Sequence, residues 1–174
     1  MKRYWICAAM GVVGLGLVWV GSRLNEPSAH AVTSQAFQQV QGLERKMSGG
    51  WFLYVYESET PAEVLMGLSA GGVEFINATP RPDGDFNCTG IGTWKAAAPN
   101  ELTSTVIVFN RDLQQNLIFY EKAVSTMTLS DDGSTLEGIG MIYIFMPGQD
   151  PMDPEEVPVF QASVPLAAKR IPAE

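Results

Sequence analysis

The sequence predicts an all-β fold: an eight-stranded antiparallel up-and-down barrel with a short helix before its first strand and a hydrophobic targeting helix before that. Three observations predict the barrel. From Trp51 onward, short runs alternate apolar and polar residues, which is the side-chain period of a β-strand. Turn-forming pairs such as Asp132-Gly133 and Pro147-Gly148 separate these runs. The 17 Gly and 11 Pro residues also favour many turns over a helical bundle.

Length, composition and charge are those of one folded domain that does not bind nucleic acid. The 174 residues suffice for a hydrophobic core, and 46% hydrophobic with 17% charged residues argues against disorder. The net charge is −8, of which residues 1–31 contribute +2 through three basic residues and one acidic residue, so −10 remains on the rest. Such an acidic surface repels phosphate backbones and anionic lipid.

The N-terminus has the layout of a targeting segment. Lys2 and Arg3 precede an apolar run over residues 4–20, and Ala29-His30-Ala31 follows as a small-residue cleavage pattern. This predicts a signal peptide, residues 1–31, cut after Ala31. The apolar run is long, so an uncleaved anchor that enters the membrane only through residues 4–20 is the alternative. Both interpretations export the barrel, as a periplasmic or secreted protein or as a membrane-anchored one.

A linker and a short amphipathic helix are predicted between the targeting segment and the barrel, over residues 32–50. The helix should begin near Ser34 and end before Gly49-Gly50. We expect it to pack against the end of the barrel. Its apolar residues recur at three- and four-residue spacing: Phe37, Val40, Leu43 and Met47.

The barrel domain is predicted to occupy residues 51–174. Eight strands joined mostly by short connections suit a closed barrel, because closure removes exposed strand edges. The candidate strands are Trp51–Glu57, Glu63–Ser69, Val73–Thr79, Gly90–Ala96, Glu101–Asn110, Asn116–Leu129, Thr135–Met146 and Val157–Ile171.

The register of one hairpin can be predicted from its turn. A two-residue Asp132-Gly133 turn sets Leu129 opposite Leu136, and the same count sets Glu121 opposite Ile144. A similar count across the turn at 111–115 places Val106 and Val108 beside Glu121 and Phe119. Glu121 then points into the lumen among apolar residues: Phe119, Ala123, Met127, Leu129, Leu136, Ile142 and Ile144.

The predicted outer face of this hairpin is unusually apolar. It carries a set of large side chains that a free surface rarely presents. Either the barrel forms a homo-oligomer through this wall, or the N-terminal helix covers it. The side chains are Tyr120, Ile139, Met141, Tyr143 and Phe145.

The residues around the first strand resemble those of lipocalins and other calycins. The run Met47-Ser48-Gly49-Gly50-Trp51 is similar to their Gly-x-Trp signature, in which a helical turn precedes the strand and the Trp packs at the closed end of the barrel. In that family an Arg of the last strand lies across this Trp. The resemblance therefore implies that Trp51 and Arg170 form a structural pair that closes the barrel.

Later segments are similar to a group of small bacterial lipocalin-like proteins of unassigned function. That group shows a Gly-x-Trp strand, a D-x-x-G-N turn and a T-L-S-x-D-G turn, and residues 90–94, 112–116 and 129–133 match them in order. Gln115 stands where the second pattern has Gly, so that hairpin is expected to differ in shape. The resemblance covers about residues 47–171. Allene-oxide-cyclase-like barrels look alike at this level, so the fold does not fix the function.

Several chemistries are excluded by residue types that the barrel lacks. The only histidine is His30, beside the predicted cleavage site, which removes catalytic triads and histidine-based metal sites from the barrel. Cys7 falls in the targeting segment, so Cys88 is left without a disulfide partner. We expect no cofactor and no metal. Four carboxylates at 150–156 could bind calcium, but no regular ligand spacing supports this and a solvated loop is the preferred interpretation.

A small set of residues remains for function. Glu121 is the candidate catalytic residue, because a carboxylate in an apolar lumen has a raised pKa and can act as acid or base. Anchoring a ligand and a structural role are its alternatives. The ligand-binding candidates are Trp51, Trp94, Phe119, Glu121, Ile142 and Ile144.

Three functions are compatible with the sequence. The first is an exported lipocalin-like barrel that binds a small apolar molecule in its lumen. The second is a cofactor-independent cyclase or isomerase of the allene-oxide-cyclase-like kind, which would use a lumenal carboxylate. The third is a structural or interaction protein of the cell envelope, suggested by the apolar outer wall. Whether the protein is an enzyme stays open.

Overall fold

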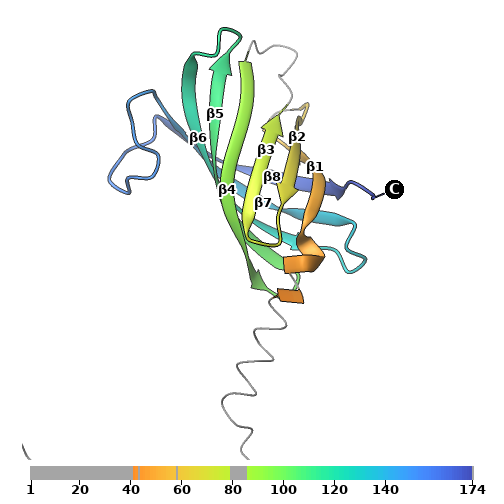
Figure 1. The fold of residues 1–174 in the computed structure, drawn as a ribbon. Coiled ribbons are helices and arrows are strands. Elements are labelled where there is room, and N and C mark those ends of the chain that lie inside the picture. The colour runs from red at the N-terminus through yellow and green to blue at the C-terminus, as the bar shows by residue number, and fades with distance from the viewer. Residues whose placement is uncertain (1–40, 43, 58, 79–85, 174) are drawn as a thin grey trace, which may run out of the picture.

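Eight antiparallel strands close into a single barrel (Figure 1), which confirms the predicted fold class. The structure is a computed structural model and describes residues 41–42, 44–57, 59–78 and 86–173. The predicted targeting segment and the predicted start of the helix lie outside these residues. Within the described part of the chain, no helix has the length and apolar character needed to span a membrane.

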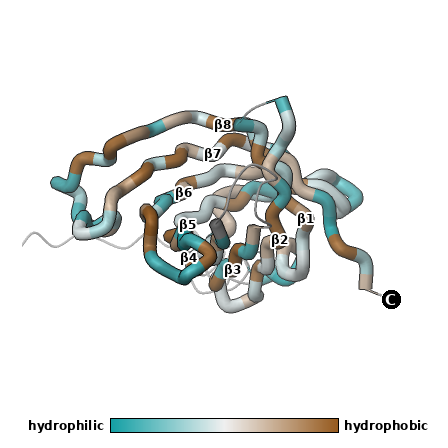
Figure 2. Tube along the Cα trace, turned by 90° about the horizontal axis from the view of Figure 1, so that it is seen from above, coloured by the Kyte–Doolittle hydropathy of each residue, from teal (hydrophilic) through white to brown (hydrophobic). Residues whose placement is uncertain are grey.

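Each strand pairs with its neighbours in sequence, and β1 pairs with β8 to close the ring, which Figure 2 shows from above. This is the up-and-down order that short connections predict. The strands are β1 (Gly49–Val55), β2 (Ala62–Leu68), β3 (Val73–Ala78), β4 (Phe86–Ala98), β5 (Glu101–Asp112), β6 (Leu117–Leu129), β7 (Thr135–Phe145) and β8 (Phe160–Arg170).

The register predicted for β6 and β7 is confirmed. Leu129 pairs with Leu136 and Glu121 with Ile144. The turn itself is longer than two residues, because the Ser130 amide donates to the Thr135 carbonyl and Gly133, at φ 74, donates to the Ser130 carbonyl. The same residues pair across this longer turn as across the predicted one, so both faces of the hairpin were assigned correctly.

The register predicted for β5 and β6 was wrong by two residues. Val108, and not Val106, pairs with Glu121. Two features cause the shift. The Asp112 amide donates to the Asn116 carbonyl across a three-residue turn, which moves the pairing by one residue. A bulge moves it by one more, because Asn110 pairs with Phe119 and Arg111 with Leu117, which leaves Ile118 as an extra residue on β6. Because the shift is even, every side chain stays on its predicted face.

The described helical residues, 41–42 and 44–47, lie at one end of the barrel. Met47 is fully buried there, and the Lys46 ammonium donates to the side chain of Asn100 in the β4–β5 turn, 3.2 Å away. The helix therefore ends before Gly49-Gly50 and packs at the barrel end, as expected. The contacts of these described helical residues are with the barrel end and not with the apolar outer wall.

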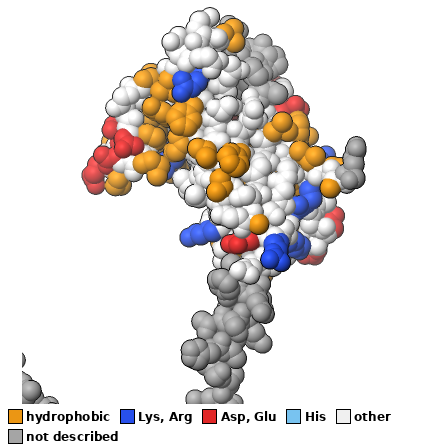
Figure 3. All heavy atoms as spheres, viewed as in Figure 1, with side chains coloured by type: hydrophobic (Ala, Val, Ile, Leu, Met, Phe, Trp, Pro, Cys, Tyr) orange, Lys and Arg blue, Asp and Glu red, His pale blue; other side chains and the backbone are white. Residues whose placement is uncertain are grey.

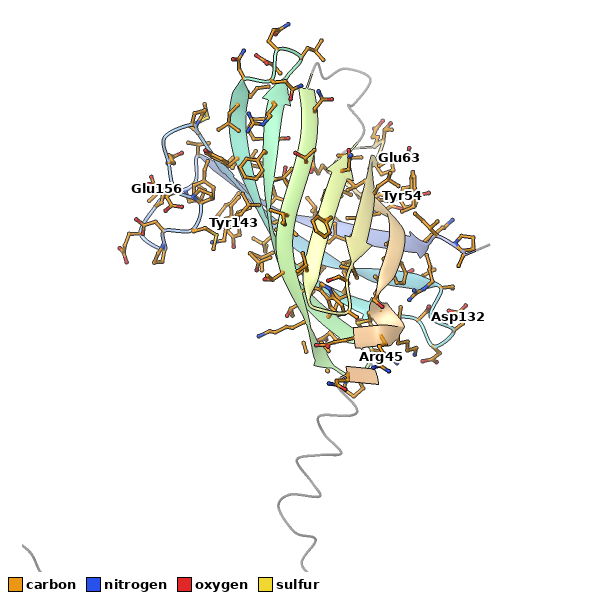
Figure 4. The ribbon with its side chains drawn as sticks, viewed as in Figure 1. Arg45, Tyr54, Glu63, Asp132, Tyr143 and Glu156 are labelled. Atoms are coloured by element: carbon orange, nitrogen blue, oxygen red, sulfur yellow. The ribbon has the colours of Figure 1, made fainter. Side chains whose placement is uncertain are left out.

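The β7–β8 connection, residues 146–159, turns back toward that outer wall (Figure 1). The Lys122 ammonium donates to the carbonyl of Pro151, 3.0 Å away, and Pro151 itself is buried. Phe145 is only 4% exposed although it points outward. Figure 4 shows Tyr143 outside the barrel, on the side of the connection that carries Glu156. The predicted apolar wall is thus partly covered by the β7–β8 connection. The sequence had suggested instead a homo-oligomer or cover by the N-terminal helix.

Other apolar side chains stay on the outer face. Phe75 and Ile91 pair across β3 and β4 and are each more than half exposed. Figure 3 shows hydrophobic side chains gathered in patches on the viewed face.

Two strand glycines lie where the backbones of neighbouring strands come close together. A Cβ atom on Gly92 would overlap the carbonyl oxygen of Thr105, and one on Gly138 would overlap that of Thr126. Only glycine allows the neighbouring backbones to approach this closely.

Candidate functional site

A cavity of about 510 Å³ lies inside the barrel, lined by residues of all eight strands. Its size falls in the range of small-molecule sites. Most lining side chains are aliphatic, and five lining positions carry only Ala or Gly, which leaves the space open. These are Ala62, Ala78, Ala123, Gly140 and Ala162.

The end of the barrel beneath the cavity is sealed by Trp51 and Arg170. Trp51 is fully buried, and its indole N–H donates to the Met47 carbonyl, 3.1 Å away. The Arg170 guanidinium lies 4.2 Å from the centre of the Trp51 ring. It also donates to the carbonyls of Ser48, Gly133 and Lys46. The pair named by the resemblance is therefore in contact, and it joins the helical segment, β1, the β6–β7 turn and β8.

Trp51 and Trp94, which were candidates for ligand contact, do not line the cavity. Both lie in the hydrophobic core. The Trp94 indole donates to the Ser69 carbonyl, 2.9 Å away, so its polar edge is used at the β2–β3 turn. Each ring serves to pack the barrel rather than to form the cavity wall.

The other candidate residues do line the cavity: Phe119, Glu121, Ile142 and Ile144. Glu121 sits on β6 between Val108 of β5 and Ile144 of β7, and it is half-buried. Glu121 therefore faces the lumen, as the register of β6 and β7 predicted.

A second lumenal carboxyl, Glu74, was not found from the sequence. It lies on β3 with Ile76 and Ala78 facing inward, and it is only 2% exposed. Burial raises the pKa of Glu74 to about 7, and a hydrogen bond with Ser104 opposes part of that rise. Its Oε2 atom is buried with no hydrogen-bond partner within the described structure.

Glu74 is the first of three hydrogen-bonded polar residues that lie on β3, β5 and β6. It hydrogen-bonds to Ser104 on β5, and the Ser104 hydroxyl lies 2.8 Å from that of Ser125 on β6. The strand between β3 and β5 is β4, and it places Gly92 beside Glu74. Because Gly92 has no side chain, the carboxyl can extend across β4 to reach Ser104.

A further polar pair, Cys88 on β4 and Asn110 on β5, lies farther along the cavity wall. The Cys88 thiol donates to Asn110 Oδ1, 2.8 Å away, and Asn110 Nδ2 is buried without a partner among the described residues. Ser104, Val106, Val108 and Asn110 are successive inward residues of β5. The stretch from Ser104 to Asn110 is roughly 20 Å long at ~3.3 Å per residue. The cavity is thus an elongated apolar space with polar groups toward both ends.

No group of three or more metal-binding side chains gathers among the described residues. In the acidic loop, Asp150 accepts from the amide of Met152 and Asp153 from that of Glu155. These two carboxylates stabilise turns of the loop.

No protein-family model matches this chain, and no curated protein or solved structure is significantly similar to it. The closed eight-stranded antiparallel barrel is consistent with a lipocalin-like fold.

Proposed function

We propose that this protein is an exported, lipocalin-like barrel that binds a small, largely apolar molecule in its lumen. The cavity carries the proposal: about 510 Å³ of mostly aliphatic wall with a few polar groups, inside a barrel closed at one end by Trp51 and Arg170. Many eight-stranded barrels of this size fill their interior with side chains. Here the small residues at inward positions keep the space open, which costs packing contacts that a ligand would restore.

A lumen-blocking variant tests this function against a matched control. Ala123 lines the cavity, and the next residue, Val124, is 36% exposed on the outer face of the same strand. The probe is N-phenyl-1-naphthylamine, an uncharged apolar dye whose fluorescence rises in an apolar environment. We expect saturable binding to the wild type and to Val124→Trp. Ala123→Trp should bind at least about tenfold more weakly, a loss of roughly 1.4 kcal/mol. Equal binding by all three proteins would contradict the proposal.

Export is the second part of the proposal, and it is supported by residues 1–31 of the sequence. Intact mass of the protein from the periplasm or medium should equal that of residues 32–174. A full-length protein in the membrane fraction would support the anchored alternative instead.

An enzyme remains the second candidate, and Glu74 favours it. Its pKa of about 7 suits a general acid or base, and no histidine is needed for such chemistry. The candidate acid of a cyclase or isomerase is then Glu74 rather than Glu121. In D2O, the wild type should exchange the α-hydrogens of bound 2-decanone faster than Glu74→Gln does, as followed by mass spectrometry. Equal exchange rates would remove this candidate.

A further inference from the structure

Within the proposed ligand-binding function, on which this inference rests, we propose that the lumen selects cationic amphiphiles. The ligand would have an apolar body and a protonated amine, and the amine would pair with Glu74. Fatty acids and other anionic amphiphiles would be rejected.

The charge of the lumen is the first argument. Three carboxyl-bearing residues line the cavity, Glu57, Glu74 and Glu121, and the other ionisable groups on it are Tyr56 and Cys88. Among the described lining residues there is no Lys, Arg or His. The sequence outside residues 1–31 carries −10 as well. A concave cavity with a low dielectric constant, whose wall carries charges of one sign, concentrates ligands of the opposite charge.

The bonding state of Glu74 is the second argument. Glu74 is only 2% exposed, yet among the described residues it has no cationic partner and its Oε2 atom has no hydrogen-bond partner. A buried carboxylate without a counter-ion is costly. An ammonium group would supply both the missing charge and the missing hydrogen bond, after a rotation that turns this oxygen toward the lumen.

The serine chain favours a donor as the partner of Glu74. When Glu74 is ionised, its carboxylate can only accept, so the Ser104 hydroxyl donates to it, and this hydrogen bond lowers the pKa of Glu74. Ser104 has then used its only hydrogen, so Ser125 donates to Ser104 across the 2.8 Å between them. Both hydroxyls therefore point their hydrogens toward Glu74, which leaves it as the acceptor at the end of the chain.

The apolar wall beside Glu74 accounts for the body of the ligand. From Glu74, the row of paired inward residues continues through Val106 and Ala123 to Ile142. An alkyl or aryl group can lie against these residues while the amine contacts the carboxyl. A neutral alcohol could make the same hydrogen bond, so the effect of charge is what separates the proposal from simple apolar binding.

The test uses three ligands of one chain length: decylamine, decanol and decanoate. Their affinities are measured by titration calorimetry on the purified wild type, on Glu74→Gln and on a control, Glu137→Gln. Glu137 is an exposed residue of β7 on the outer face. We expect the wild type and the control to bind decylamine at least about tenfold more tightly than decanol, with decanoate the weakest. In Glu74→Gln, decylamine should bind no more tightly than decanol.

A test on the wild type alone guards against a variant that does not fold. Decylamine stays protonated from about pH 6 to about pH 8, whereas Glu74 ionises across this range. The ratio of decylamine to decanol affinity should therefore rise several-fold between these pH values. The rise should be absent in a folded Glu74→Gln protein, in which the other lumenal ionisable groups, Glu57, Glu121, Tyr56 and Cys88, are unchanged.

The outcomes separate the two proposals. Decanol binding without a preference for decylamine, or a preference that survives in Glu74→Gln or does not change with pH, would overturn the amine inference and leave the proposed function standing. Failure of all three ligands to bind would overturn both.

Discussion

At the scale of single residues, Arg170 holds the closed end of the barrel together. Its guanidinium donates to three backbone carbonyls, from the helical segment, the residue before β1 and the β6–β7 turn. It also covers the face of the fully buried Trp51 ring. A hydrogen bond from a charged donor stabilises a fold by about 1.5–3 kcal/mol and a cation–π contact by about 0.5–2 kcal/mol, and the contributions are not fully additive.

Replacing Arg170 should therefore destabilise the barrel markedly. We expect Arg170→Ala to lower the free energy of unfolding by about 2–4 kcal/mol, measured by urea denaturation. Arg170→Lys should lie between this variant and the wild type, because an ammonium cannot present a planar fork to three carbonyls. A loss below about 0.5 kcal/mol for Arg170→Ala would contradict the role assigned to this residue.

Glu74 makes stability depend on pH. Its pKa is about 7 in the fold, above the 4.5 of an unburied glutamate, so the folded state binds the proton more tightly than the unfolded chain. Stability is therefore unaffected by this group below pH 4.5 and falls as the pH rises from about 4.5 to about 7. A shift of this size corresponds to about 3 kcal/mol at most.

Glu74→Gln should remove this loss of stability. At about pH 5 the variant and the wild type should unfold at similar urea concentrations, because the carboxyl is then largely neutral. At about pH 8 the variant should be more stable, by up to about 3 kcal/mol. The control Glu137→Gln should show no such change. A stability difference that is the same at both pH values would show that Glu74 does not titrate as its burial implies.

At the scale of elements, the β5–β6 turn has a residue in an unfavourable conformation. Gln115 has φ 69, in the left-handed region that favours glycine, and its amide donates to the Asp112 carbonyl, 2.9 Å away. Asp112 also accepts from Asn116, which closes the turn. A side chain in this conformation costs about 1–2 kcal/mol.

Gln115→Gly should stabilise the protein. Relief of the left-handed strain outweighs the extra flexibility of glycine in the unfolded chain, so we expect a gain of about 0.5–1 kcal/mol in the free energy of unfolding. Thermal unfolding of the two proteins measures it. An unchanged or lower Tm would mean that the Gln115 side chain makes a compensating contact.

Gly92 and Gly138 lie where the backbones of paired strands approach each other closely. Gly138→Ala should cost several kcal/mol, about 3 or more, because its Cβ would overlap the backbone of Thr126 in the paired strand. Gly71→Ala is the control: its Cβ would meet only the Ser69 hydroxyl at 3.8 Å. Chemical denaturation that finds the two variants equally stable would contradict the proposed close approach of β6 and β7.

At the scale of the whole molecule, alternation and turn chemistry were enough to predict the barrel, its strand count and the β6–β7 register. The β5–β6 register was missed because neither the three-residue turn between Asp112 and Asn116 nor the bulge at Ile118 leaves a mark in an alternating sequence. Glu74 was missed because β3 is apolar on both faces: Phe75 is 54% exposed, whereas Ile76 faces inward. Alternation cannot orient such a strand. The partial cover of the outer wall by residues 146–159 is a tertiary contact between distant segments that the sequence pattern does not encode.

The central claim is that the lumen is an open, apolar cavity, and xenon binding tests it most directly. Xenon enters dry apolar cavities of this kind and is located in crystals by its anomalous scattering. We predict a xenon atom inside the barrel, in contact with Ala123 and Ile142, in crystals held under xenon pressure. A lumen that is filled by side chains, with xenon bound only outside the barrel or not at all, would contradict the account.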